Sequence, residues 1–214
     1  ASVRSVSVGL DEPETRALLQ QVPEVYRTQV NDVLLAALGR VLGGWTGRER
    51  VIVDLEGHGR EELFEEVDLS RTVGWFTTLF PVDLLAESSS DWRTRLTSVK
   101  EHLRAIPGRG LGYGALRYLT AALDNNVASS LTSPTPQISF NYLGHFDLPA
   151  GSDDLYHTIH VELRLDESPD AQRAHALEVV GKVEGNRLVF TWFYSEDLHR
   201  RATVSSLADN LLNT

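Results

Sequence analysis

Hydrophobic residues recur along the chain with two periods, one typical of strands and one typical of helices. Val6 and Val8 alternate with polar residues, which predicts a strand near the start of the chain. Residues 51–55 and 76–84 are short apolar runs of the kind found in buried strands. The same reasoning predicts strands over 137–143, 158–165, 175–184 and 188–194, the last two joined as a hairpin at Gly185-Asn186.

Apolar residues at steps of three and four predict helices between the strands. Asp11 and Glu14 have the spacing of a capping box, and this first helix is expected to stop near Pro23. Thr28 is expected to cap a second helix with a wide apolar stripe, and Gly43-Gly44 to end it. Further helices are predicted over 91–106, 115–123 and 202–212. The order of elements predicts an α/β lobe with one mixed sheet and helices packed on it.

Composition narrows the class of protein. The chain has 214 residues and a formal net charge of −10, and this acidic balance argues against a nucleic-acid partner. It contains no cysteine, which removes disulfides and thiol nucleophiles and is compatible with a cytoplasmic protein. His157 and His160 are three apart on a predicted strand and point to opposite faces, so they are poor metal ligands.

The start of the chain suggests a larger parent polypeptide. There is no methionine, no apolar run long enough to cross a membrane and no signal segment. The chain opens directly in a strand pattern. We therefore expect it to be an excised piece, although trimming or an engineered start would give the same pattern.

Four short stretches combine glycine, aromatic and charged residues. They are Glu56-Gly57-His58-Gly59-Arg60-Glu61, the stretch from Arg71 to Pro81, the stretch from Pro107 to Gly114, and Phe140-Asn141-Tyr142-Leu143-Gly144. The first follows a predicted buried strand, where loops of α/β folds often carry catalytic groups. The third has glycines at alternate positions, but it follows a helix and lacks the spacing of a dinucleotide-binding loop.

Together these stretches resemble the epimerization domains of nonribosomal peptide synthetases. The family motifs read approximately EGHGRE, RTVGWFTxxYPV, PxxGxGYG and FNYLG, and the chain departs from them only at Phe80, where the family has tyrosine. Residues 32–39 match a fifth, helical motif, DxLLxAxG. The resemblance implies that residues 1–214 are the C-terminal lobe of a two-lobed, chloramphenicol-acetyltransferase-like fold. The family's HHxxxDG motif belongs to the other lobe and is not in this sequence, so the fragment alone is expected to be inactive.

The resemblance also implies an activity and a set of site residues. Family members invert the Cα centre of an aminoacyl or peptidyl thioester on a carrier protein by acid/base proton transfer. Carried over residue by residue, the catalytic candidates are Glu56, Arg60, Asn141 and Tyr142. The substrate-binding candidates are His58, Trp75, Phe76 and Tyr113. No metal or cofactor is expected in the lobe, because the phosphopantetheine arm belongs to the carrier protein.

Structural roles compete with several of these assignments. Arg60 is expected either to orient Glu56 or to form a structural ion pair, and His58 to hold the turn. Trp75 and Phe76 are expected in the core or in a channel wall. Asn141 and Tyr142 should point to opposite faces of a regular strand, so at most one faces the channel unless the strand bends at Gly144.

Two other functions remain open. The chain is compatible with the C-terminal lobe of a condensation domain, which forms peptide bonds on the same fold, or with a noncatalytic lobe that docks a carrier protein. The expected partners are a peptidyl carrier protein and the missing N-terminal lobe. An isolated lobe would expose its channel wall and partner face, so self-association is also expected.

Overall fold

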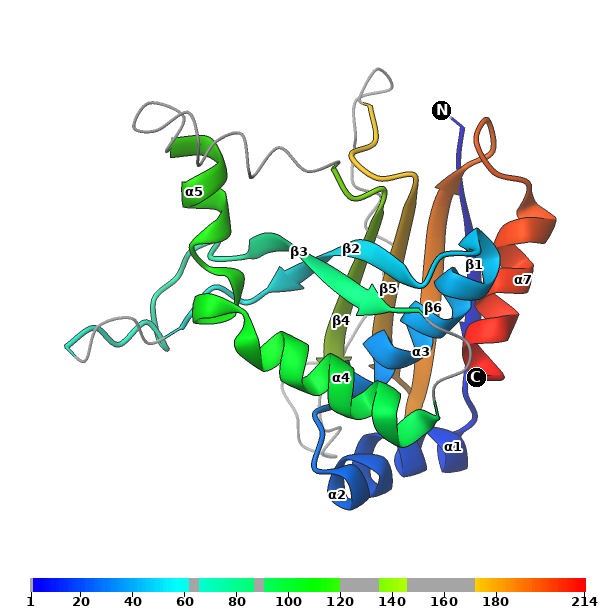
Figure 1. The fold of residues 1–214 in the computed structure, drawn as a ribbon, viewed down its shortest axis with the longest axis horizontal. Helices are drawn as coiled ribbons and strands as arrows, with labels where there is room; N and C mark the ends of the chain where they lie inside the picture. Colours follow the sequence, from blue (N-terminus) through cyan, green and yellow to red (C-terminus); the bar gives the residue numbers. More distant parts are fainter. Residues whose placement is uncertain (1, 62–65, 87–90, 120–134, 146–171) are drawn as a thin grey trace, which may run out of the picture.

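A computed structural model describes residues 2–61, 66–86, 91–119, 135–145 and 172–214. Within these residues the chain forms one six-stranded mixed sheet with strand order β1-β6-β5-β4-β2-β3 (Figure 1). The strands are β1 (Val3–Gly9), β2 (Arg50–Gly57), β3 (Thr78–Leu85), β4 (Ile138–His145), β5 (Leu177–Glu184) and β6 (Arg187–Ser195). The predicted mixed sheet is confirmed, and the strand predicted over 158–165 lies outside the described residues.

The helices are α1 (Glu12–Arg16), the π-helical η1 (Ala17–Gln21), α2 (Val22–Tyr26), α3 (Val30–Thr46), α4 (Trp92–Ala105), the 3₁₀ turn η2 (Pro107–Gly110), α5 (Tyr113–Leu119) and α7 (Arg201–Leu212). Helices α3, α4 and α7 lie along the sheet (Figure 1). Apolar side chains that alternate along the strands fill the space beneath them. In β2, Val51, Val53 and Leu55 are buried in this core, while Ile52 on the other face is exposed. The sheet therefore has one covered face and one that carries polar side chains.

Local chemistry explains why the elements begin where they do. Asp11 and Glu14 form the predicted capping box at α1. Gly185 and Asn186 both adopt positive φ, at 56° and 60°, and make the tight turn predicted between β5 and β6.

Two predicted helix ends are wrong. The first helical segment passes through Pro23, because proline is tolerated in the first turn of α2, and it ends at Arg27 with φ 51°. Helix α3 continues through Gly43 to Thr46 and stops at Gly47. Gly43 serves close packing instead, since a Cβ there would lie 2.4 Å from the carbonyl oxygen of Ala86.

One predicted cap is also displaced. Helix α3 is capped by Gln29 rather than Thr28. The reason is the carboxylate three residues on: Asp32 accepts a hydrogen bond from the backbone N–H of Gln29 at 2.7 Å and closes a capping box there.

Candidate functional site

Glu56 lies near the end of β2 on the polar face of the sheet. The alternation of side chains along a strand places Asp54 and Glu56 on that face, opposite the buried Val53 and Leu55. β4 runs parallel to β2, with Leu55 paired to Phe140. This register brings Asn141, the next residue of β4, to the level of Glu56.

A short hydrogen bond joins these two residues. Asn141 Nδ2 donates to Glu56 Oε2 at 2.5 Å. Protein atoms around the Glu56 carboxylate remove part of its hydration, and this desolvation, followed by the negative charge of Glu178, raises its pKa. The hydrogen bond from Asn141 and the nearby His175 act in the opposite direction. The net result is a carboxylate whose pKa lies above its usual value.

The glycines of the first motif allow close contact with the second. Gly59 has φ 66°, and a Cβ there would lie 1.6 Å from the carbonyl oxygen of Phe76. A Cβ on Gly57 would lie 2.8 Å from the hydroxyl of Thr78. The loop after Glu56 can therefore follow the 76–78 segment only because these positions lack side chains.

The third motif packs into the same region. Gly110 has φ 81°, and a Cβ there would lie 2.2 Å from ring atoms of Phe80. Phe80 is the position at which the family motif has tyrosine. With Asn141 bonded to Glu56, all four sequence motifs meet around the end of β2, although they are far apart along the chain.

Arg60 makes its contacts away from Glu56. Its guanidinium donates to the carbonyl oxygen of Leu69 at 2.5 Å and to that of Gly74 at 3.4 Å. It also lies 4.2 Å from the centre of the Phe76 ring. The expected orienting contact with Glu56 is not formed among the described residues, and Arg60 instead contacts the 69–76 segment.

His58 holds the turn, as expected. Its Nδ1 accepts a hydrogen bond from the backbone N–H of Arg60 at 3.0 Å, and its Nε2 lies 3.2 Å from Oε1 of Glu61. These contacts stay within the motif.

The aromatic candidates Tyr142 and Trp75 differ in how deeply they are buried. Tyr142 packs against the core while Asn141 faces Glu56, so the two point to opposite faces, and burial raises the pKa of the Tyr142 hydroxyl. Gly144, with φ 74°, follows in a bulge of β4. Trp75 is 90% exposed, so it does not pack in the core of this chain, and its assignment to a channel wall stays a prediction.

Two polar pairs beside Glu56 were not predicted. His175 Nε2 lies 2.8 Å from Oδ2 of Asp54, and both side chains are buried. Arg173 lies 3.1 Å from Glu178. A signal for Asp54 existed, because it interrupts the apolar run of a predicted buried strand. No sequence signal joined it to His175, 121 residues away.

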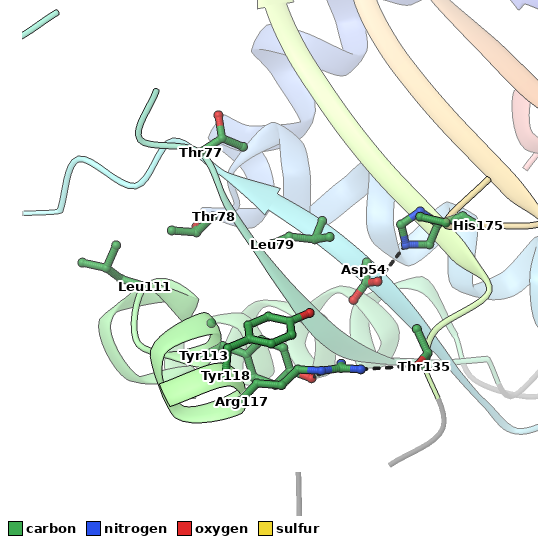
Figure 2. A pocket seen from close by; sticks show the side chains of 12 residues that line it. Asp54, Thr77, Thr78, Leu79, Leu111, Tyr113, Arg117, Tyr118, Thr135 and His175 are labelled. Carbon is green, nitrogen blue, oxygen red and sulfur yellow. Dashed lines mark hydrogen bonds and ion pairs between the residues drawn. The ribbon is translucent and has the colours of Figure 1, made fainter. Parts of the chain in front are cut away.

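A cavity of about 350 Å³ adjoins the Asp54–His175 pair (Figure 2). Asp54 and His175 face it from the sheet, and Tyr113 and Arg117 face it from α5 (Figure 2). Arg117 donates to the hydroxyl of Tyr113 at 2.9 Å and to that of Thr135 at 3.4 Å. The cavity thus combines a buried acid–imidazole pair with a cation on the opposite wall.

Neither a metal site nor a membrane span is found in the part of the chain that the structure describes. No group of three or more histidine and carboxylate side chains there is arranged to hold a metal ion. No helix there is long and apolar enough to cross a membrane.

Comparison with known proteins relates this geometry to biosynthetic enzymes. The sequence profile of the family described as "Condensation domain" matches residues 2–214. The chain is 48% identical over 212 residues to part of a linear gramicidin synthase of Brevibacillus parabrevis, a match that covers 99% of this chain and 4% of that protein. It is 44% identical over 214 residues to chondramide synthase cmdD of Chondromyces crocatus, a match that covers 100% of this chain and 5% of that protein.

Solved structures share the fold. The epimerization domain from the third module of tyrocidine synthetase B is 35% identical, with a TM-score of 0.82 over 99% of this chain and 46% of that one. The cyclization-docking bidomain EpoB of Sorangium cellulosum is 14% identical, with a TM-score of 0.67 over 99% of this chain and 40% of that one, a likeness of fold alone. The chain thus spans less than half of these structures and a small part of the synthases. It belongs to the condensation domain family of nonribosomal peptide synthetases.

Proposed function

We propose that residues 1–214 form the C-terminal lobe of an epimerization domain, which inverts the Cα centre of an aminoacyl or peptidyl thioester held on a carrier protein. The observation that carries this proposal is the Glu56 carboxylate, held by Asn141 at 2.5 Å and with a raised pKa. A carboxylate with a raised pKa is a stronger base and exchanges protons closer to neutral pH.

The chemistry requires removal of a proton from one face of Cα and its return to the other. The thioester carbonyl acidifies the Cα proton, and Glu56 is placed to take or return it on one face. The second acid/base group then belongs to the part of the domain outside this chain. The products of the first step are an enolate and a protonated carboxyl group, so charge is conserved.

Asn141 has a second task in this scheme. Its amide carries two N–H donors, and the hydrogen bond to Glu56 uses one. The other has no partner among the described residues and could donate to the thioester oxygen, where negative charge develops in the enolate. Tyr142 packs against the core instead, and its role is to hold β4, and with it Asn141, in position.

Similarity to a solved epimerization domain favours this activity over peptide-bond formation. That structure is 35% identical to the chain, whereas the first condensation domain of the CDA synthetase is 14% identical. The motifs around Glu56, Trp75, Tyr113 and Asn141 also match those of epimerization domains. Condensation remains the second candidate, because the family profile is named for it.

The test uses the complete domain that contains this chain, with an L-aminoacyl thioester loaded on its carrier protein in D2O. Hydrolysis and chiral analysis then report the configuration and deuterium content of the released residue. We expect a mixture of L and D residues with deuterium at Cα. Formation of a peptide bond to a second loaded carrier, with no deuterium at Cα, would identify a condensation domain instead.

A further inference from the structure

The cavity beside α5 begins next to Glu56. Asp54 lies two residues before Glu56 on the same face of β2, about 7 Å away at the usual rise of a strand. Leu79 is the direct partner of Glu56 across the antiparallel β2–β3 pair, where Cβ atoms are about 5 Å apart. Both residues line the cavity. When the Cα of a substrate lies at Glu56, the cavity is therefore close enough to be reached by about two further residues of the substrate.

The walls of the cavity carry several hydrogen-bonding groups. The buried Asp54–His175 pair lies on the sheet side, and Thr78 and Thr135 also line the cavity. Leu79 and Leu111 add apolar surface. A pocket of this kind suits a ligand with alternating polar and apolar groups better than it suits a single hydrocarbon side chain.

Arg117 provides the main donor group. A guanidinium carries five N–H donors, and two of them are used in the bonds to Tyr113 and Thr135. Within the described residues the other donors have no partner and can serve carbonyl oxygens of a ligand in the cavity, while the two bonds hold the guanidinium in place. The cavity volume, about 350 Å³, is within the range of about 300–1,000 Å³ found for sites that hold drug-sized ligands.

We propose that this cavity binds the upstream peptide of a peptidyl thioester, that is, the two or three residues attached to the amino group of the residue at Glu56. This inference rests on the proposed function, because that function places the substrate Cα at Glu56. Peptide carbonyls accept hydrogen bonds from Arg117, and peptide side chains contact Leu79 and Leu111. Such a site makes the domain prefer a peptidyl substrate over an aminoacyl one.

Two glycines of the same segment give a matched pair of variants. Gly114 lines the cavity, and a Cβ added there meets no atom within 4 Å, so Gly114→Leu places a side chain into open space in the cavity. Gly112 also has open space for a Cβ, and it does not line the cavity, so Gly112→Leu is the control. Arg117→Gln is a second variant, which removes the cation while leaving the volume similar.

The experiment measures dissociation constants of the complete domain for two stable ligands by NMR titration. The ligands are alanyl-pantetheine amide and acetyl-trialanyl-pantetheine amide, which share the residue at Cα. We expect the tripeptidyl amide to bind at least about tenfold more tightly to the wild type and to Gly112→Leu. Gly114→Leu should remove this advantage, and Arg117→Gln should reduce it at least about threefold.

The proposal is overturned if the two amides bind equally, if neither binds, or if the advantage of the tripeptidyl amide survives Gly114→Leu. Equal weakening of both amides by Gly114→Leu would also overturn it, because the cavity would then hold the residue at Cα itself. Binding is measured without turnover. A preference for the tripeptidyl amide in a domain that does not epimerize would therefore refute the proposed function and leave the peptide site standing.

Discussion

The amide of Asn141 in β4 donates a 2.5 Å hydrogen bond to the carboxylate of Glu56 in β2. The two residues are 85 positions apart in the chain, and the parallel pairing of Leu55 with Phe140 brings them side by side. This contact fixes one oxygen of the carboxylate. It also opposes the two influences that raise the pKa of Glu56, which are desolvation and the charge of Glu178.

Substitution of the neighbours should move the pKa of Glu56 in opposite directions. Asn141→Leu removes a donor that favours the charged form, so the pKa should rise further. Glu178→Gln removes a like charge, so the pKa should fall. A ¹³C NMR titration of the glutamate carboxyl groups measures both shifts, with the exposed Glu101 as internal control. Shifts of the same sign would refute this account of the electrostatics.

The raised pKa of Glu56 also predicts how stability depends on pH. The folded state binds its proton more tightly than the unfolded state, whose glutamate titrates near 4.5. Between 4.5 and the folded pKa the native state therefore holds more protons, so stability falls as pH rises through this window. Glu56→Gln should flatten that part of the curve. Urea unfolding at pH values from about 4 to 8 tests this, and identical curves for both proteins would count against it.

The buried Asp54–His175 pair should respond unequally to loss of each partner. His175→Leu leaves a buried carboxylate without its partner, which costs about 3–5 kcal/mol of unfolding free energy. Asp54→Leu leaves a buried imidazole nitrogen without its hydrogen-bond partner, and the cost should be nearer about 1–3 kcal/mol, that of one unsatisfied polar group.

Denaturant unfolding of both single variants and the double variant at neutral pH measures this difference. The double variant should be more stable than His175→Leu, because it no longer buries a lone carboxylate. A larger loss for Asp54→Leu than for His175→Leu would show that the pair is not held together in this way.

The loop after Glu56 should not tolerate a side chain at Gly59. Gly59→Ala forces a Cβ to within 1.6 Å of the Phe76 carbonyl at a positive φ, so the loop must move, and we expect a loss of about 2 kcal/mol or more. Gly112→Ala has open space and should stay within about 0.5 kcal/mol of the wild type. Comparable melting temperatures for the two variants would contradict the packing described for this loop.

Local patterns predicted most elements of the fold, because strand alternation, helix stripes and turn residues act over a few neighbours. The Gly185-Asn186 hairpin and the Asp11 capping box are examples. The end of α3 was missed for a tertiary reason. Gly43 looks like a helix stop in the sequence, yet it is there because Ala86 passes close to the helix.

The site was only partly predictable from the sequence. Motif resemblance indicated Glu56 and Asn141, which the sheet brings into contact. It also indicated Arg60, whose side chain instead contacts Leu69, Gly74 and Phe76. The pairing of Asp54 with His175 and the place of Arg117 over the cavity depend on how β2, the start of β5 and α5 assemble, and no local pattern records that assembly.

The most direct test of the role of Glu56 is deuterium incorporation at Cα by the complete domain carrying Glu56→Gln. Glutamine keeps the size and the amide contact but cannot accept the proton, so exchange should fall at least about 100-fold, the lower range for a general acid/base group. Glu101→Gln on the surface of α4 should leave the rate unchanged. Wild-type exchange in the Glu56→Gln protein, with the fold intact, would show that Glu56 does not transfer the proton.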